Sequence, residues 1–155
     1  MKPRFVADCN VGKLARWLRA LGYDATYHHQ ISDGDLVKRA FAETRILLTR
    51  DVDLTHRRPI DTGQVRAILL ESDQVLAQLR QVMTEVGLVP SKSLSRCLEC
   101  NLALRRRPLE VVADRVPPHV AATQSRYREC PRCHRVYWAG THWTRMRETL
   151  RMAFG

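Results

Sequence analysis

In the first ninety residues, short apolar runs alternate with stretches in which apolar residues recur at helical spacing. Four short runs predict strands, at residues 4–7, 25–27, 46–49 and 65–70. Three periodic stretches predict helices: one over 11–21, one opening at 32–35 with Leu36, Val37, Ala40 and Phe41 buried, and one ending at Gly87. Strands that alternate with helices predict a parallel sheet flanked by helices, which is an α/β fold.

Residues at the ends of these elements carry further local signals. Asn10 is expected to cap the helix over 11–21, and Ser72 or Asp73 the last helix of this half. The polar run 55–59 is expected to form a short helical turn that leads into a loop.

The pattern changes after a linker at residues 88–94. Short segments, two cysteine pairs and a final amphipathic helix with Trp143, Met146, Leu150 and Phe154 follow it. The chain is therefore expected to form two domains, residues 1–90 and residues 91–155.

The charge of the chain is uneven. The formal net charge is +10, with +2 in residues 1–90 and +8 in residues 91–155. A basic half beside a nearly neutral one favours a polyanionic partner such as nucleic acid. The alternative is a basic soluble protein without such a partner.

Several classes of protein are disfavoured by what the chain lacks. No apolar segment approaches the ~18 residues of a membrane span, and no long apolar run follows Met1-Lys2-Pro3-Arg4. We therefore expect no membrane span, no signal peptide and a cytoplasmic location. The first turn has neither a Gly-x-Gly-x-x-Gly motif nor a P-loop, so a glycine cradle for a dinucleotide or NTP is not expected.

Four of the five cysteines form two Cys-x-x-Cys turns, Cys97 with Cys100 and Cys130 with Cys133, separated by 29 residues. Without an export signal, an odd number of cysteines argues against a disulfide framework. Two such turns supply the four thiolates of a structural Zn²⁺ site. The alternative is two unrelated redox or buried pairs. The long gap predicts an insertion between the turns, and a domain this small is expected to need its metal to fold.

The same half combines arginines with aromatic residues. The arginines are Arg105, Arg106, Arg107, Arg115, Arg126, Arg128, Arg132 and Arg135, with Tyr127, Tyr137 and Trp138 among them. Such a mixture can bind single strands through phosphate contacts and base stacking. The alternative is that the aromatic residues fill a small core, which we favour for Trp138.

Acidic residues follow two of the predicted strands, Asp8 after 4–7 and Asp51 after 46–49. In an open α/β sheet, the carboxyl ends of the strands form the ligand crevice, and carboxylates are ligands for Mg²⁺ or Mn²⁺. A carboxylate at an interior strand end without a partner is costly, so we see no structural alternative for either residue.

Other acids are expected near this edge, and most of them have structural alternatives. They are Asp33, Asp35, Asp53 and Asp73. Asp33 can be a helix cap, Asp35 can complete a capping box with Ser32, and Asp73 can cap the last helix. Asp24, Asp61 and Glu43 are expected to be solvated.

Longer motifs resemble a known family. In the first half they are Phe5-Val6-Ala7-Asp8, Gly12-Lys13-Leu14-Ala15-Arg16-Trp17-Leu18-Arg19, Leu21-Gly22-Tyr23-Asp24 and Leu47-Leu48-Thr49-Arg50-Asp51. In the second half they are Ser95-Arg96-Cys97 with Cys100-Asn101, Arg115-Val116-Pro117-Pro118, Cys130-Pro131 with Cys133, Val136-Tyr137-Trp138 and Gly140-Thr141-His142-Trp143. Together they resemble the PIN-like ribonuclease family named after the C-terminal RNase domain of the mutator exonuclease mut-seven.

The resemblance implies a PIN-like α/β domain followed by a zinc ribbon. It also implies that acidic residues hold Mg²⁺ or Mn²⁺. By position these acids fall on Asp8 and Asp51, with Asp35 or Asp33 between them and Asp53 as a further candidate. The chain departs from the family at Val52-Asp53, where relatives often carry a basic residue after the Asp.

Three functions remain open at this stage. The first is a metal-dependent endoribonuclease whose zinc ribbon binds single-stranded or structured RNA. The second is a non-catalytic RNA- or ribosome-binding adaptor on a PIN-like scaffold. The third is a toxin-like nuclease, although no segment for a protein partner is visible.

Overall fold

The computed structural model describes residues 2–154, without the side chains of residues 141 and 142. The chain forms two compact units, one that ends at Pro90 and one that begins at Ser91.

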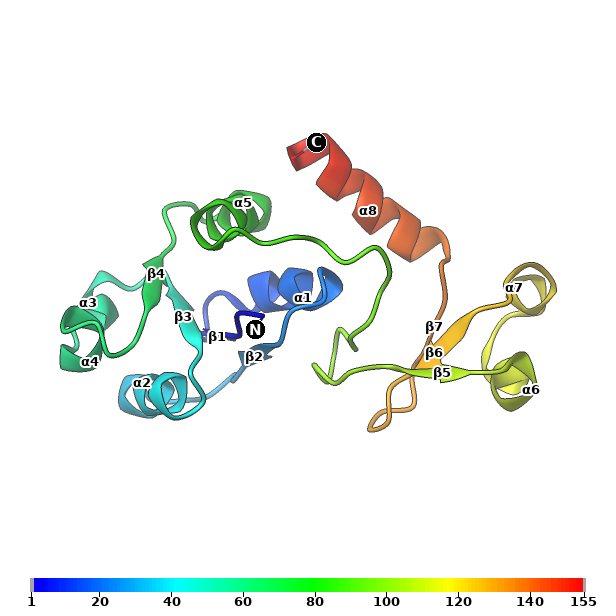
Figure 1. The fold of residues 1–155 in the computed structure, drawn as a ribbon, viewed down its shortest axis with the longest axis horizontal. Helices are drawn as coiled ribbons and strands as arrows, with labels where there is room; N and C mark the ends of the chain where they lie inside the picture. Colours follow the sequence, from blue (N-terminus) through cyan, green and yellow to red (C-terminus); the bar gives the residue numbers. More distant parts are fainter. Residues whose placement is uncertain (1, 155) are drawn as a thin grey trace. The chain divides into compact units, whose positions relative to one another are not determined.

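A four-stranded parallel sheet is the centre of the first unit (Figure 1). Its strands are β1 (Phe5–Ala7), β2 (Ala25–Tyr27), β3 (Ile46–Thr49) and β4 (Ala67–Leu69), in the order β2-β1-β3-β4. The α/β prediction is confirmed. β1 and β4 are shorter than predicted, but the backbone continues β4 with a bond from the Leu70 N–H to the Thr49 carbonyl at 2.8 Å.

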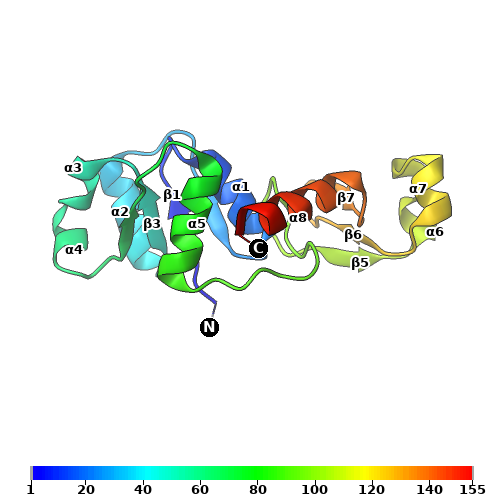
Figure 2. The ribbon, with the colours of Figure 1, turned by 90° about the horizontal axis from the view of Figure 1, so that it is seen from above.

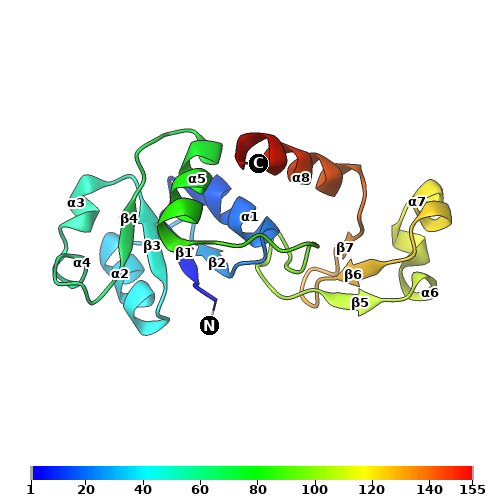
Figure 3. The same ribbon diagram turned by 45° about the horizontal axis from the view of Figure 1, so that its top comes forward.

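Helices cover both faces of this sheet. They are α1 (Gly12–Ala20), α2 (Asp33–Ala42), α3 (Val52–Thr55), α4 (Arg58–Asp61) and α5 (Val75–Val86). Figure 3 shows α1 and α5 side by side on one face, with α2 on the other. Val6 and Leu47 pack with Leu36, Val37 and Ala40 of α2 in one core cluster. Because both faces are covered, the central strands are continuously apolar rather than alternating.

The structure corrects three local predictions. Phe41 is 60% exposed, since it lies at the margin of the buried stripe of α2, in the last turn. Asn10 does not cap α1, because Val11 occupies that position and makes no side-chain cap bond. Neither Ser72 nor Asp73 caps α5, whose N-cap position is Gln74.

The second unit contains a three-stranded antiparallel sheet in the order β5-β6-β7. Its elements are β5 (Arg105–Arg107), α6 (Leu109–Val112), the 3-10 helix η1 (Ala113–Arg115), α7 (Pro118–Thr123), β6 (Tyr127–Glu129), β7 (Val136–Tyr137) and α8 (Thr141–Phe154). The expected insertion is thus α6, η1 and α7, and Figure 2 shows α6 and α7 together at one end of β5 and β6.

The insertion builds a small core of its own. Val112, Val116, Val120 and Tyr127 form a buried cluster, and Trp138 packs against it. Trp138 therefore has the core role that we favoured. Among the described helices, none is long and apolar enough to span a membrane.

Candidate functional site

The four predicted cysteines meet at one point in the second unit. The sulfur atoms of Cys97, Cys100, Cys130 and Cys133 all lie within 4.8 Å of one another. The Sγ atoms of Cys97 and Cys133 are 3.8 Å apart. A tetrahedral ion with Zn–S bonds of about 2.3 Å separates its sulfur ligands by about 3.8 Å, so the cluster can hold a metal ion such as zinc.

The two cysteine turns share the same backbone geometry. In each turn the residue after the second cysteine donates its N–H to the carbonyl of the first cysteine, Asn101 to Cys97 at 2.9 Å and His134 to Cys130 at 3.0 Å. Both residues have positive φ, 65° and 61°. Asn and His are among the non-glycine residues that adopt this conformation most readily. Two matching turns are what a zinc ribbon of four cysteines requires.

Backbone N–H groups donate hydrogen bonds to two of the four sulfur atoms. The N–H of Cys100 donates to Cys97 Sγ at 3.3 Å, and that of Arg132 donates to Cys130 Sγ at 3.4 Å. Burial raises the pKa of Cys130, but hydrogen bonds from the N–H groups of Cys133 and Arg132 and from the side chains of Cys133 and Cys97 lower this pKa to about 7. The Tyr137 hydroxyl adds a contact to Cys97 Sγ at 3.3 Å.

The carboxyl edge of the parallel sheet brings Asp8 and Asp51 to neighbouring strands. β1 and β3 are adjacent, Asp8 directly follows β1, and Asp51 comes two residues after β3. The chain passes from β1 to β2 on one side and then to β3 on the other. The carboxyl ends of β1 and β3 therefore flank the topological switch point, where ligands of open α/β sheets bind.

Thr49 connects these two positions, and sequence reasoning missed it. Its hydroxyl donates to Asp8 Oδ2 and accepts from the Asp51 N–H at 3.0 Å. Its side chain is fully buried. A buried hydroxyl requires hydrogen-bond partners. The sequence signal for this role was therefore a Thr at the end of a buried strand, close to an Asp that follows the strand.

Asp8 is 6% exposed and is held by two donors, the Thr49 hydroxyl and the Asn10 N–H at 2.7 Å. Asp51 is exposed and has a structural role that we did not expect. Its Oδ1 accepts from the N–H groups of Asp53 at 2.9 Å and Leu54 at 3.3 Å, so it caps α3. The prediction that Asp51 has no structural alternative was therefore wrong.

Three of the remaining predicted acids lie in first helical turns, whereas Asp73 precedes the N-cap of α5. Asp53 is exposed in α3, and Asp33 and Asp35 are exposed in α2. Ser32 Oγ accepts from the Asp35 N–H at 3.1 Å, so Ser32 is the cap of α2. Within residues 2–154, no three carboxylates bring their oxygen atoms within 4.8 Å of one another.

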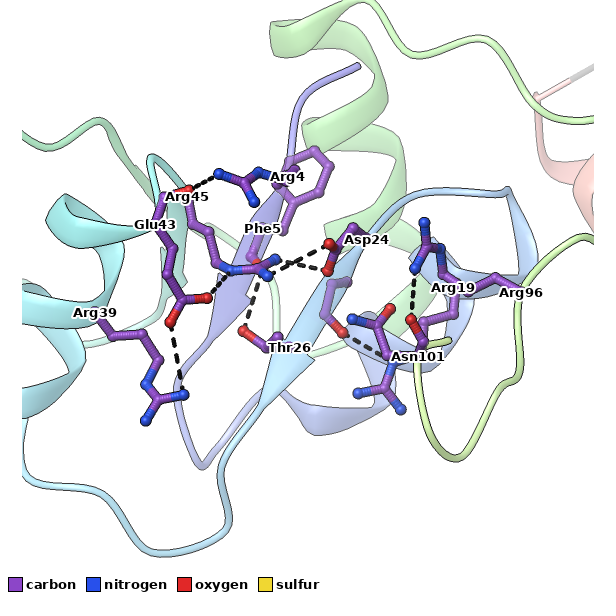
Figure 4. A network of polar contacts seen from close by, with 11 residues as sticks. Arg4, Phe5, Arg19, Asp24, Thr26, Arg39, Glu43, Arg45, Arg96 and Asn101 are labelled. Atoms are coloured by element: carbon purple, nitrogen blue, oxygen red, sulfur yellow. Dashed lines mark hydrogen bonds and ion pairs between the residues drawn. The ribbon is translucent and has the colours of Figure 1, made fainter. Parts of the chain in front are cut away.

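A polar network occupies the opposite, amino-terminal edge of the sheet (Figure 4). Arg45, which is 8% exposed, donates to Asp24 Oδ1 at 2.7 Å and to Glu43 Oε1 at 2.8 Å. Asp24 and Glu43 were expected to be solvated, but both neutralise this buried guanidinium. Asp24 therefore has a structural role at the edge that lies away from Asp8 and Asp51.

The arginines of the second unit differ in their partners. Arg107 and Arg115 both donate to the buried carboxylate of Glu129, Arg107 at 2.9 Å. These two guanidinium groups hold the pKa of Glu129 below its ordinary value. Tyr127 is buried, with its hydroxyl donating to the Val120 carbonyl at 3.0 Å. It is therefore a core residue rather than a stacking platform.

The fold and the cysteine cluster define a two-unit α/β protein, with a parallel sheet and a unit of zinc-ribbon type. Comparison with known families then assigns the chain. Residues 3–150 match the family described as the Mut7-C RNAse domain, so the protein belongs to that family. No curated protein and no solved structure matched the chain.

Proposed function

We propose that this protein is a metal-dependent ribonuclease that hydrolyses RNA phosphodiester bonds, with its zinc-ribbon unit binding the RNA. The observation that carries the proposal is the hydrogen-bonded connection from Asp8 through Thr49 to Asp51 at the switch point of the sheet. Membership in an RNase domain family supports it.

The chemistry of these donors fits a hard cation. Mg²⁺ is usually held by one or two carboxylates together with water and substrate phosphates, so Asp8 and Asp51 suffice without a cluster of three acids. Asp35, Asp33 and Asp53 are the further candidates. When bound, Mg²⁺ or Mn²⁺ would activate a water molecule and neutralise charge on the scissile phosphate.

The residues of the chain have distinct tasks in this proposal. Thr49 would hold Asp8 in place through the hydrogen bond that its hydroxyl donates to Oδ2. Asp51 presents Oδ2 while its Oδ1 caps α3. Structural hydrogen bonds thus preorganise both carboxylates before any ligand is present.

The test is cleavage of labelled RNA and single-stranded DNA with Mg²⁺, with Mn²⁺ and without divalent ion, for wild type and Asp51→Asn. Asn is also a good helix cap, so this variant is expected to keep α3 and lose the metal ligand. Loss of an outer partner of a metal site typically costs about 10–100-fold, and loss of a direct ligand should cost more. Asp8→Asn should behave alike.

The alternative function is a non-catalytic RNA-binding adaptor, which is favoured by the exposed carboxylates that do not converge. Wild-type protein that binds RNA and never cleaves it with either ion would support the adaptor. Cleavage that persists in both Asp variants would refute the assignment of the site.

A further inference from the structure

A groove of about 1110 Å³ lies within the second unit, between its sheet and α8. Seven Lys or Arg residues line it, against one acidic residue, Glu148. Pockets for single small molecules have volumes of about 300–1,000 Å³. The size and charge of this groove therefore suit a stretch of a polyanion rather than one small ligand.

One wall of the groove is a row of side chains across the sheet. Arg106 of β5 lies directly opposite Arg128 of β6, and Arg128 lies opposite Tyr137 of β7. Residues directly opposite in an antiparallel sheet share a face. Like charges in that relation are destabilising, so an anion bound between Arg106 and Arg128 would relieve a repulsion that the free protein carries.

The other wall is one face of α8. Trp143, Arg147 and Arg151 follow at intervals of four residues and all line the groove. Arg151 forms an ion pair with Glu148 at 2.5 Å, whereas Arg147 forms none with any described residue.

Three of the arginines that line the groove form no ion pair within the described residues, so their charge can contact a bound anion. Arg106, Arg126 and Arg147 are exposed, and none of them makes an ion pair within residues 2–154. Arg107 differs because Glu129 neutralises it, and Arg128 differs because it donates to the Leu94 carbonyl at 2.7 Å. The groove thus contains two kinds of arginine, those held by partners within the protein and those free to contact a ligand.

We propose that this groove is the binding site for a single-stranded segment of RNA. Its available arginines would contact successive phosphates, and the half-buried ring of Tyr137 would stack against unpaired bases. Paired bases do not expose their faces for such stacking. The choice of RNA as the ligand rests on the proposed function. The choice of this groove as the binding site rests on its size, its charge and its lining residues.

The test is binding of labelled single-stranded RNA and of duplex RNA of equal length to the full chain, at several salt concentrations and without Mg²⁺ or Mn²⁺. The variant is the double change Arg106→Gln with Arg147→Gln. Each phosphate contact to a single strand contributes a salt slope of about −0.7. Two lost contacts should reduce the slope by about 1.4 and weaken binding about 25-fold at ~0.1 M salt.

The matched control is Arg105→Gln with Arg145→Gln, which removes the same charge from the same two elements. Neither of these residues lines the groove. The proposal is overturned if both double variants lose affinity equally, or if duplex RNA binds as tightly as the single strand. Because binding is measured without Mg²⁺ or Mn²⁺, a failure of this binding proposal can be told apart from a failure of the proposed ribonuclease activity.

Discussion

Thr49 is the residue on which the geometry of the carboxyl edge depends. It is fully buried, donates to Asp8 and accepts from the Asp51 backbone. We predict that Thr49→Val, which keeps the shape of the side chain, lowers the free energy of unfolding by about 1–3 kcal/mol because Asp8 and the Asp51 N–H lose a buried partner. Denaturant unfolding measures this loss.

The same variant separates a positioning role from a purely structural one. Thr49→Val is expected to reduce metal-dependent cleavage about 10–100-fold, as for other groups that orient metal ligands. Thr49→Ser keeps the hydroxyl and is expected to restore cleavage. If Thr49→Val is destabilised but cleaves as wild type, Thr49 does not orient the site.

At the scale of elements, a glycine ends α5. Gly87 has φ of 77°, and its N–H donates to the Met83 carbonyl at 2.9 Å. We predict that Gly87→Ala costs about 1–2 kcal/mol, the cost of the left-handed conformation for a residue with Cβ. Thermal unfolding measures it.

Gly34 is the matched control for this change, since it lies in the first turn of α2, with no neighbour closer than 3.7 Å to an added Cβ. Gly34→Ala is expected to stabilise the protein by up to about 1 kcal/mol. If both changes alter the free energy of unfolding equally, the left-handed conformation at Gly87 is not the cause of the loss.

The elements that the sequence predicted well are those set by local pattern. The strand at 46–49, the strand at 25–27 and the stop at Gly87 all depend on neighbouring residues. The two cysteine turns were equally visible, because a Cys-x-x-Cys spacing fixes the turn itself.

Contacts between distant residues were not predictable in the same way. Arg45 reaches Asp24 across 21 positions, and Thr49 reaches Asp8 across 41. No periodicity links such residues, so Asp24 was wrongly expected to be solvated. Asp51 was seen as a ligand candidate only, because the pattern did not show that a helix begins at Val52.

At the scale of the whole molecule, the two units have separate means of stability. The first has a covered sheet with a large apolar core, and the second has a small cluster and the four cysteines. We predict that Cys130→Ser, or removal of zinc by a chelator, unfolds the second unit and leaves the first folded. Backbone amide resonances assigned to each unit would report this.

Cys9 provides the control for this prediction. It is exposed and lies outside the four-cysteine cluster, so Cys9→Ser should leave the resonances of both units unchanged. Simultaneous loss of both units on chelation would show that the metal stabilises the chain as a whole.

Tyr137 takes part in both features of the second unit, since its hydroxyl contacts Cys97 Sγ while its ring lines the groove. If a ligand in the groove contacts this ring, occupancy of the cysteine cluster and occupancy of the groove become linked equilibria. If metal raises the affinity of the groove for its polyanion by some factor, the polyanion must raise the affinity for metal by the same factor. In that case, removal of the metal would also weaken binding in the groove.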